Sequence, residues 1–125
     1  MSKDKLIEAA VEAKEKAYAP YSNFHVGCAI LAGGKIYSGF NIENASYSLS
    51  ICAERTAAVS AILDGSRDFK ELALSADGEN FIVPCGACLQ FLAEFSKNLD
   101  IVLVNGRGDK KNTTLKELLP VPFEL

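Results

Sequence analysis

Residues 69–105 read FKELALSADGENFIVPCGACLQFLAEFSKNLDIVLVN and set the type of sheet that this chain can form. The run from Phe69 to Ala76 predicts a strand that ends at the turn Asp77-Gly78. Pro84 precedes a helix over Cys85 to Phe95, and Asp100 to Asn105 supplies another strand. Because a helix separates these two strands, the pattern favours parallel pairing between them.

The first part of the chain predicts a helix followed by a hairpin. Ser2 can cap a helix whose apolar residues recur at helical spacing and which ends before Pro20. Phe24 to Ala32 is rich in strand formers, and Lys35 to Ile42 reads as a second strand. Since only Gly33-Gly34 separates them, we expect the two strands to form a hairpin.

Two more helices complete the expected elements. Cys52 to Leu63 is rich in alanine and stops at Asp64-Gly65, which is typical of a buried helix with a glycine cap. Residues 106–112 read as a polar loop, after which Thr113 can cap a short helix through Leu119. The sequence therefore predicts an α/β fold, a three-layer α/β/α sandwich with a mixed sheet, as a single domain over residues 1–125.

Charge and hydropathy narrow the classes of partner. The 125 residues carry a formal net charge of −3, whereas non-specific nucleic-acid binding needs an excess of Lys and Arg, so we expect no nucleic-acid partner. Apolar runs such as Val26 to Ala32 are far shorter than the roughly 20 residues that cross a bilayer. Residues 1–17 mix charges into their apolar positions, unlike a signal peptide. We therefore expect a cytoplasmic protein with no membrane partner.

Two cysteine clusters each open a predicted helix. Cys52 lies at the start of one helix, and Cys85 and Cys88 lie at the start of another. Helix N-termini stabilise thiolates, because unpaired N–H groups and the positive end of the dipole lower the thiol pKa. Three thiolates would supply three of the four tetrahedral positions on Zn²⁺ and leave the fourth open, as in catalytic zinc sites where a bound water can be ionised.

Two charged residues follow Cys52 closely in the chain. Glu54 is near enough to sit over the metal without ligating it, so its carboxylate could act as a proton shuttle. Three thiolates and Zn²⁺ leave one surplus negative charge, which would make the metal a poorer Lewis acid. We expect Arg55 to offset that charge by hydrogen bonding to the ligand sulfurs.

A C-x-x-C pair by itself has two other interpretations. It could be a thioredoxin-like redox pair or half of a structural zinc site, that is, part of a module without catalysis. The C-x-E motif at the start of a second helix weakens both, and a structural site would normally have a fourth Cys or His. The spare candidates, His25 and Cys28, lie in a predicted strand, where we expect an interface or surface histidine and a packing cysteine.

Taken together, the motifs resemble those of the small, all-cysteine cytidine deaminases, in order and spacing, over nearly the whole chain. The matching motifs are Tyr18-Ala19-Pro20-Tyr21-Ser22-Asn23-Phe24, Val26-Gly27, Asn41-Ile42-Glu43-Asn44-Ala45, Cys52-Ala53-Glu54-Arg55-Thr56-Ala57, Pro84-Cys85-Gly86-Ala87-Cys88 and Leu118-Leu119-Pro120. The resemblance implies the cytidine deaminase fold and hydrolysis of cytidine and 2′-deoxycytidine to the uridines and ammonia, with Zn²⁺ as cofactor. It also implies that Glu54 is the proton shuttle, Arg55 the charge compensator and the zinc ligands Cys52, Cys85 and Cys88.

The resemblance further implies a nucleoside pocket that is shared between subunits. Phe24 would pack on the base, and the backbone N–H of Ala53 would meet the base carbonyl. Asn41 and Glu43 would hydrogen-bond the sugar hydroxyls. Similar proteins are homotetramers in which three residues reach a neighbouring subunit's pocket. Here these residues are Ala45, Tyr47 and Phe123.

Three departures from the family pattern stand out. Leu89 follows the last predicted ligand where the family usually has Arg, and Cys28 replaces a usual alanine. The sequence stops two residues after Phe123, whereas relatives commonly continue with an acidic tail. Leu89 and the short tail suggest an alternative substrate, a modified or antibiotic cytosine nucleoside, for the same site.

Overall fold

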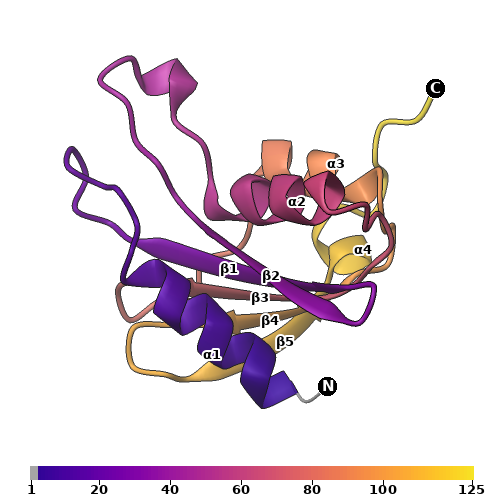
Figure 1. The fold of residues 1–125 in the computed structure, drawn as a ribbon, viewed down its shortest axis with the longest axis horizontal. Helices are drawn as coiled ribbons and strands as arrows, with labels where there is room; N and C mark the ends of the chain where they lie inside the picture. The colour runs from indigo at the N-terminus through magenta and orange to yellow at the C-terminus, as the bar shows by residue number, and fades with distance from the viewer. Residues whose placement is uncertain (1–2) are drawn as a thin grey trace.

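The structure, a computed structural model, describes residues 3–125, which form three layers (Figure 1). Its helices are α1 (Lys3–Lys14), α2 (Ala53–Leu63), α3 (Gly86–Ala93) and α4 (Leu115–Leu118), with a short 3₁₀ helix, η1, over Tyr47–Leu49. Its strands are β1 (Val26–Ala32), β2 (Lys35–Phe40), β3 (Phe69–Ala76), β4 (Asp100–Val104) and β5 (Lys110–Thr114). Helix α1 covers one face of the sheet, and α2, α3 and α4 cover the other (Figure 1). Ser2, the predicted cap of the first helix, lies outside the described residues.

The sheet is mixed and has the strand order β2-β1-β3-β4-β5. Strand β1 pairs antiparallel with β2 and β3, while β4 pairs parallel with β3 and antiparallel with β5. The β1–β2 hairpin turns at Gly33 and Gly34, whose φ values of 58° and 76° are those that a tight hairpin turn requires. The parallel pairing of β3 and β4 and the predicted three-layer α/β fold with a mixed sheet are both confirmed.

Two apolar cores lie on the two faces of the sheet. On one face, Leu6 and Ala10 of α1 pack with Val102 of β4. On the other face, residues of α2, α3 and α4 pack with Leu72 and Leu74 of β3. The second core therefore fixes α2 and α3, the helices that begin at the cysteine clusters. Among residues 3–125, none of the helices is both long and apolar enough to pass through a membrane.

Helix α2 lies so close to β2 that only glycine fits at one position between them. A Cβ atom on Gly39 would lie 2.3 Å from the backbone nitrogen of Ala57 and 2.3 Å from Oγ1 of Thr56. The Thr56 Oγ1 atom itself lies 2.9 Å from the carbonyl oxygens of Phe40 and Ala53. At its other end α2 stops as predicted, because Gly65, with a φ of 90°, donates its N–H to the carbonyl of Ile62.

Gly39→Ala should therefore destabilise the protein. The added methyl group would have to displace the α2 backbone, and overpacking of this kind costs about 1–3 kcal/mol of unfolding free energy. Urea unfolding should show a lower midpoint than that of the parent chain. Gly86→Ala is the matched control, since a Cβ there would meet no atom within 4 Å among the described residues other than its chain neighbours and the backbone of its own helix. An equal loss in both variants would contradict the packing explanation.

The C-terminal part of the chain differs from the predicted order of elements. The predicted polar loop over residues 106–112 is wrong in its second half, because Lys110–Thr114 forms strand β5. The predicted cap Thr113 is also wrong. The cap of α4 is Thr114, whose hydroxyl accepts a hydrogen bond from the N–H of Glu117 at 3.1 Å. Strand β5 lies at the edge of the sheet and has exposed Lys110 and Lys111, so it lacks the apolar alternation that identifies a strand.

Candidate metal centre and adjoining cavity

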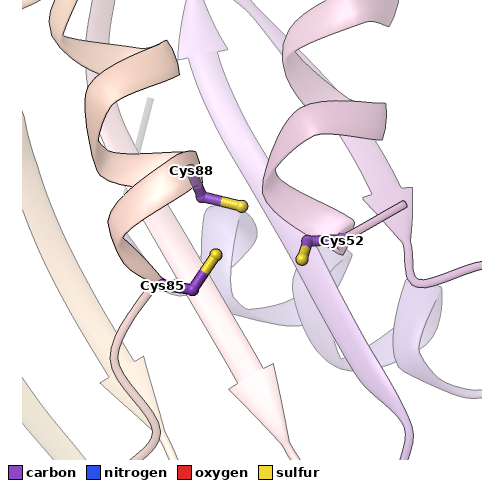
Figure 2. Close-up of side chains that lie close together, drawn as sticks. All are labelled: Cys52, Cys85 and Cys88. Atoms are coloured by element: carbon purple, nitrogen blue, oxygen red, sulfur yellow. The ribbon is translucent and has the colours of Figure 1, made fainter. Parts of the chain in front are cut away.

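Three cysteines converge between the first turns of α2 and α3 (Figure 2). Cys52 is the N-cap of α2, Cys85 is the N-cap of α3, and Cys88 follows in the first turn of α3. Their Sγ atoms all lie within 4.8 Å of one another, and Figure 2 shows the three side chains directed toward a common centre. All three are free cysteines. The two helix starts thus bring three unpaired thiols together.

The sulfur cluster fits a metal ion. In a tetrahedral zinc site the Zn–S distance is about 2.3 Å, which places two ligand sulfurs about 3.8 Å apart. The observed limit of 4.8 Å is close to this separation. Two helix N-termini meet at the cluster and favour the thiolate form, which binds metal. Three sulfurs leave one tetrahedral position for a ligand from outside the protein, as in catalytic zinc sites.

The thiols and Arg55 form one electrostatic unit. A hydrogen bond from the Cys88 thiol, together with bonds from Arg55 and Cys85, lowers the pKa of Cys52 to about 5. The same bond to Cys52, together with burial, raises the pKa of Cys88. The Nη2 atom of Arg55 donates to Cys52 Sγ at 3.8 Å. Arg55 therefore lies where the predicted charge compensation requires a cation.

The Glu54 side chain lies in a dry environment beside the same cluster. Only 4 % of its surface is exposed, and its charge acts on the buried thiols of Cys28 and Cys88. Burial, reinforced by the charge of Cys52, raises the pKa of Glu54 to about 7. A carboxyl group with that pKa can accept and release a proton at neutral pH, which is what a proton shuttle must do.

A cavity of about 410 Å³ opens beside Cys52, and its size suits a small-molecule ligand. Its walls come from the segment after α1, the chain that follows β2 and the residues just before α2. The lining residues are Tyr21, Ser22, Asn41, Ile42, Glu43, Tyr47, Ser50, Ile51 and Cys52. The cavity thus brings the predicted sugar contacts Asn41 and Glu43 to one side of the metal centre. Tyr47, which the resemblance assigned to the pocket of a neighbouring subunit, also lines the cavity of its own chain.

Asn41 and Glu43 already bind the chain at the start of β1 and in the segment just before it. The Asn41 side chain accepts from the N–H of Val26 and donates to the carbonyl of Phe24, both at 2.9 Å. The Glu43 carboxylate accepts from the N–H groups of Tyr21 and Ser22, at 2.9 and 3.1 Å, and from the Ser22 hydroxyl. Hydrogen bonds from Ser22 and Tyr21 accordingly lower the pKa of Glu43. Both polar side chains are therefore fixed in orientation at the wall of the cavity.

The other predicted contacts lie in different surroundings. Phe24 is half-buried just before β1, and Ala53 is fully buried as the first residue of α2. Ala45 is exposed just before η1. Phe123 does not line this cavity. It lies in the C-terminal tail with 71 % of its surface exposed, and its backbone exchanges two hydrogen bonds with the Gln90 side chain on α3.

Two of the residues that depart from the family pattern are core residues. Leu89 and Cys28 are buried in the core between the sheet and the helices α2 and α3, and the prediction that Cys28 is a packing residue is confirmed. Tyr21 and Ser22 line the cavity although the sequence did not single them out. Their signal was the matching motif over residues 18–24, in which a hydroxyl two residues before Phe24 can reach the later segment.

Fold and site together define a metal-dependent enzyme, because a thiolate-lined centre, a buried carboxyl and a ligand-sized cavity meet at one edge of an α/β sandwich. The family described as the cytidine and deoxycytidylate deaminase zinc-binding region matches residues 1–104. The chain belongs to this zinc-dependent deaminase family. The resemblance seen in the motifs is thereby confirmed, Zn²⁺ is the cofactor of the family site, and neither a redox module nor a different substrate is favoured.

The chain is also similar to named cytidine deaminases and to solved structures of such enzymes. A cytidine deaminase of Sporosarcina psychrophila is 50 % identical over 125 residues, which cover 98 % of this chain and 92 % of that protein. The crystal structure of a cytidine deaminase from Burkholderia pseudomallei superposes with a TM-score of 0.93 at 49 % identity, over 98 % of this chain and 100 % of that one. A cytidine deaminase structure from Mycobacterium tuberculosis has a TM-score of 0.86 at 33 % identity, over 100 % and 99 %.

Proposed function

We propose that this protein hydrolyses cytidine and 2′-deoxycytidine to uridine and 2′-deoxyuridine, with release of ammonia. The observation that carries the proposal is the meeting of three cysteine sulfurs within 4.8 Å of one another beside a buried glutamate and a nucleoside-sized cavity. Water supplies the new carbonyl oxygen; one of its hydrogens ends on the ring nitrogen and the other on the exocyclic amine, which leaves as ammonia. No redox partner is needed for this reaction.

In this proposal the chain's own residues hold the metal and move the protons. Cys52, Cys85 and Cys88 bind Zn²⁺, and Arg55 neutralises the surplus negative charge. Bound zinc supplies a Lewis acid that activates water at neutral pH. Glu54 takes the proton that the water loses, delivers it to the ring nitrogen and later protonates the departing amine. Its burial keeps solvent from competing for these protons.

Substrate recognition is proposed for Asn41 and Glu43 at the wall of the cavity, and for Phe24 and Ala53, which lie outside its lining. After its two bonds to the backbone, Asn41 still has one N–H and one lone pair available. Glu43 accepts three hydrogen bonds and keeps one acceptor position free. These groups match the hydroxyls of a ribose, each of which can donate and accept. The flat ring of Phe24 is proposed to pack on the base, and the N–H of Ala53 to bind the base carbonyl.

We also propose that the protein is a single-domain cytoplasmic homotetramer. Tyr47 and Phe123 support this arrangement, since 75 % and 71 % of their surfaces are exposed in the isolated chain. Together with Ala45, they would reach the cavity of a neighbouring copy. Burial of such aromatic surface is a common source of association energy. Sedimentation velocity measures the number of subunits, and full activity of a monomer would contradict this arrangement.

Cytidine turnover by zinc-replete protein tests the proposed function. Incubation with cytidine should change the ultraviolet absorbance of the base and release ammonia and uridine in equal amounts. A panel that includes deoxycytidine, base-modified cytosine nucleosides and single-stranded DNA locates the preferred substrate class. Absence of conversion by protein with one zinc per chain would contradict the proposal, and preference for a modified nucleoside would narrow it.

A further inference from the structure

Asp77, the first residue after β3, joins three separate parts of the chain next to Phe24. Its Oδ2 atom accepts from the backbone N–H of His25 at 2.8 Å and lies 2.8 Å from Nδ1 of the same residue. Its own backbone N–H donates to the carbonyl of His25 at 3.1 Å. Its other carboxylate oxygen forms an ion pair with Lys14, the last residue of α1, at 3.2 Å.

These contacts hold His25, the residue that follows Phe24, by its backbone N–H, its carbonyl and its ring. The side chains of Lys14 and Asp77 are 14 % and 34 % exposed, so their ion pair is partly shielded from water. Partial burial acts to raise the pKa of Asp77, but the bonds from His25 and Lys14 outweigh it and lower that pKa. Asp77 is therefore ionised near neutral pH, and the hydrogen bond that its carboxylate accepts from the backbone N–H of His25 is charge-assisted.

The Phe24 ring lies near the turn at Gly78, the residue that follows Asp77. A Cβ atom built on Gly78 would lie 3.9 Å from Cε1 of Phe24, so the edge of the ring faces this turn with room for about one methyl group between them. The turn is held to the loop after β4, because the N–H of Gly106 donates to the carbonyl of Gly78 at 2.6 Å. The carbonyl of Phe24 accepts from the Asn41 side chain at 2.9 Å, so the backbone of this residue is tied down next to the bonds of His25.

We infer that Asp77 is a positioning residue for the deamination reaction, which holds the backbone at His25 so that the Phe24 ring stays in the orientation that receives the base. This inference rests on the proposed role of Phe24 in the proposed function. Asp77 does not line the cavity, and we propose no contact between Asp77 and the substrate. Its effect would pass through the backbone of His25 and the ring of Phe24 alone.

A fluorescence experiment tests the positioning without relying on turnover. The chain has no tryptophan, so Phe24→Trp places a single reporter at this position. Adding Asp77→Ala should shift the emission to longer wavelength and increase quenching by acrylamide, because the ring gains freedom and exposure. Asp77→Asn should change neither, since its amide oxygen still accepts from the His25 N–H. Unchanged emission and quenching in the alanine variant would overturn the inference.

Kinetics with the native Phe24 give the second readout. Asp77→Ala should raise the KM for cytidine about tenfold with kcat changed less than about twofold, and Asp77→Asn should restore most of the loss. In a Phe24→Ala background, Asp77→Ala should add less than about a further twofold. Additive losses in that background would show a general structural role and overturn the inference.

A matched variant separates positioning from general stability. Asp64 also follows a regular element, pairs with a lysine, Lys35, and accepts a hydrogen bond from Tyr37 at 2.6 Å, so Asp64→Ala removes similar contacts elsewhere. It should leave the KM and the reporter fluorescence unchanged, and zinc content should be equal in all variants. If the parent chain with full zinc does not convert cytidine, the proposed function fails, while the fluorescence experiment still decides whether Asp77 holds residue 24.

Discussion

Replacing Glu54 with glutamine should reduce the kcat for cytidine about 10³-fold while the protein keeps its zinc. Glutamine has nearly the same shape as glutamate but cannot carry a proton between reacting atoms, and general acid–base catalysis contributes about 10²–10⁴-fold. The loss should fall on kcat more than on KM, because the carboxyl acts in the transition state. Steady-state assays and zinc content per chain measure both parts of this prediction.

The control for this variant is a glutamate at the far end of α3, away from the cysteines at the start of that helix. Glu94 is the exposed C-cap of α3, so Glu94→Gln removes one charge without touching the cluster and should leave kcat unchanged. If Glu54→Gln lost zinc and activity together, Glu54 would be needed to bind the metal. If it kept the parent kcat, the proton-shuttle role would be wrong.

Removal of zinc by a chelator should abolish turnover and lower the thermal unfolding midpoint by about 10 °C. A bound ion would join α2 to α3 through Cys52, Cys85 and Cys88, and its removal would break that link between the two helices. When the metal is removed, the folded state loses the free energy of metal binding, and the free energy of unfolding falls by that amount. Addition of Zn²⁺ should restore both activity and midpoint, as followed by calorimetry and by the cytidine assay.

Single cysteine variants separate the cluster from the rest of the chain. Cys88→Ser should fail to retain zinc after dialysis and should be inactive. Cys28→Ala is the matched control, because Cys28 is equally buried and is not part of the group of three sulfurs. It should keep one zinc per chain and normal turnover. Full activity in protein shown to be free of zinc would contradict the proposed role of the metal.

The sheet was predictable because its signals are local, whereas its last strand was not. Phe69–Ala76 and Asp100–Val104 are apolar runs with a helix between them, and both strands are buried, so the sequence reveals them. Strand β5 is recognisable only from its backbone pairing with β4, since Lys110 and Lys111 show the composition of a loop. Residues of an edge strand can be polar, because they bury little apolar surface, and such a strand therefore has no apolar pattern by which the sequence could predict it.

The metal centre was more predictable than the cavity. The spacing of Cys85 and Cys88 and the placement of Cys52 before an alanine-rich run locate three helix-start thiols from the sequence alone. The bonds of Glu43 to Tyr21 and Ser22 join residues about twenty positions apart, from the two irregular segments that flank the β1–β2 hairpin. No periodicity encodes such contacts. The position of the Phe24 ring near Gly78 could not be predicted from the sequence for the same reason.

The lysines on β5 also restrict how copies of this chain can assemble. An edge strand with unpaired backbone groups invites another molecule to extend the sheet, but Lys110 and Lys111 would have to lose their hydration for that to happen. Association is thereby directed away from this edge. Contacts through other surfaces can close into a small symmetric particle instead of growing into an open-ended fibre.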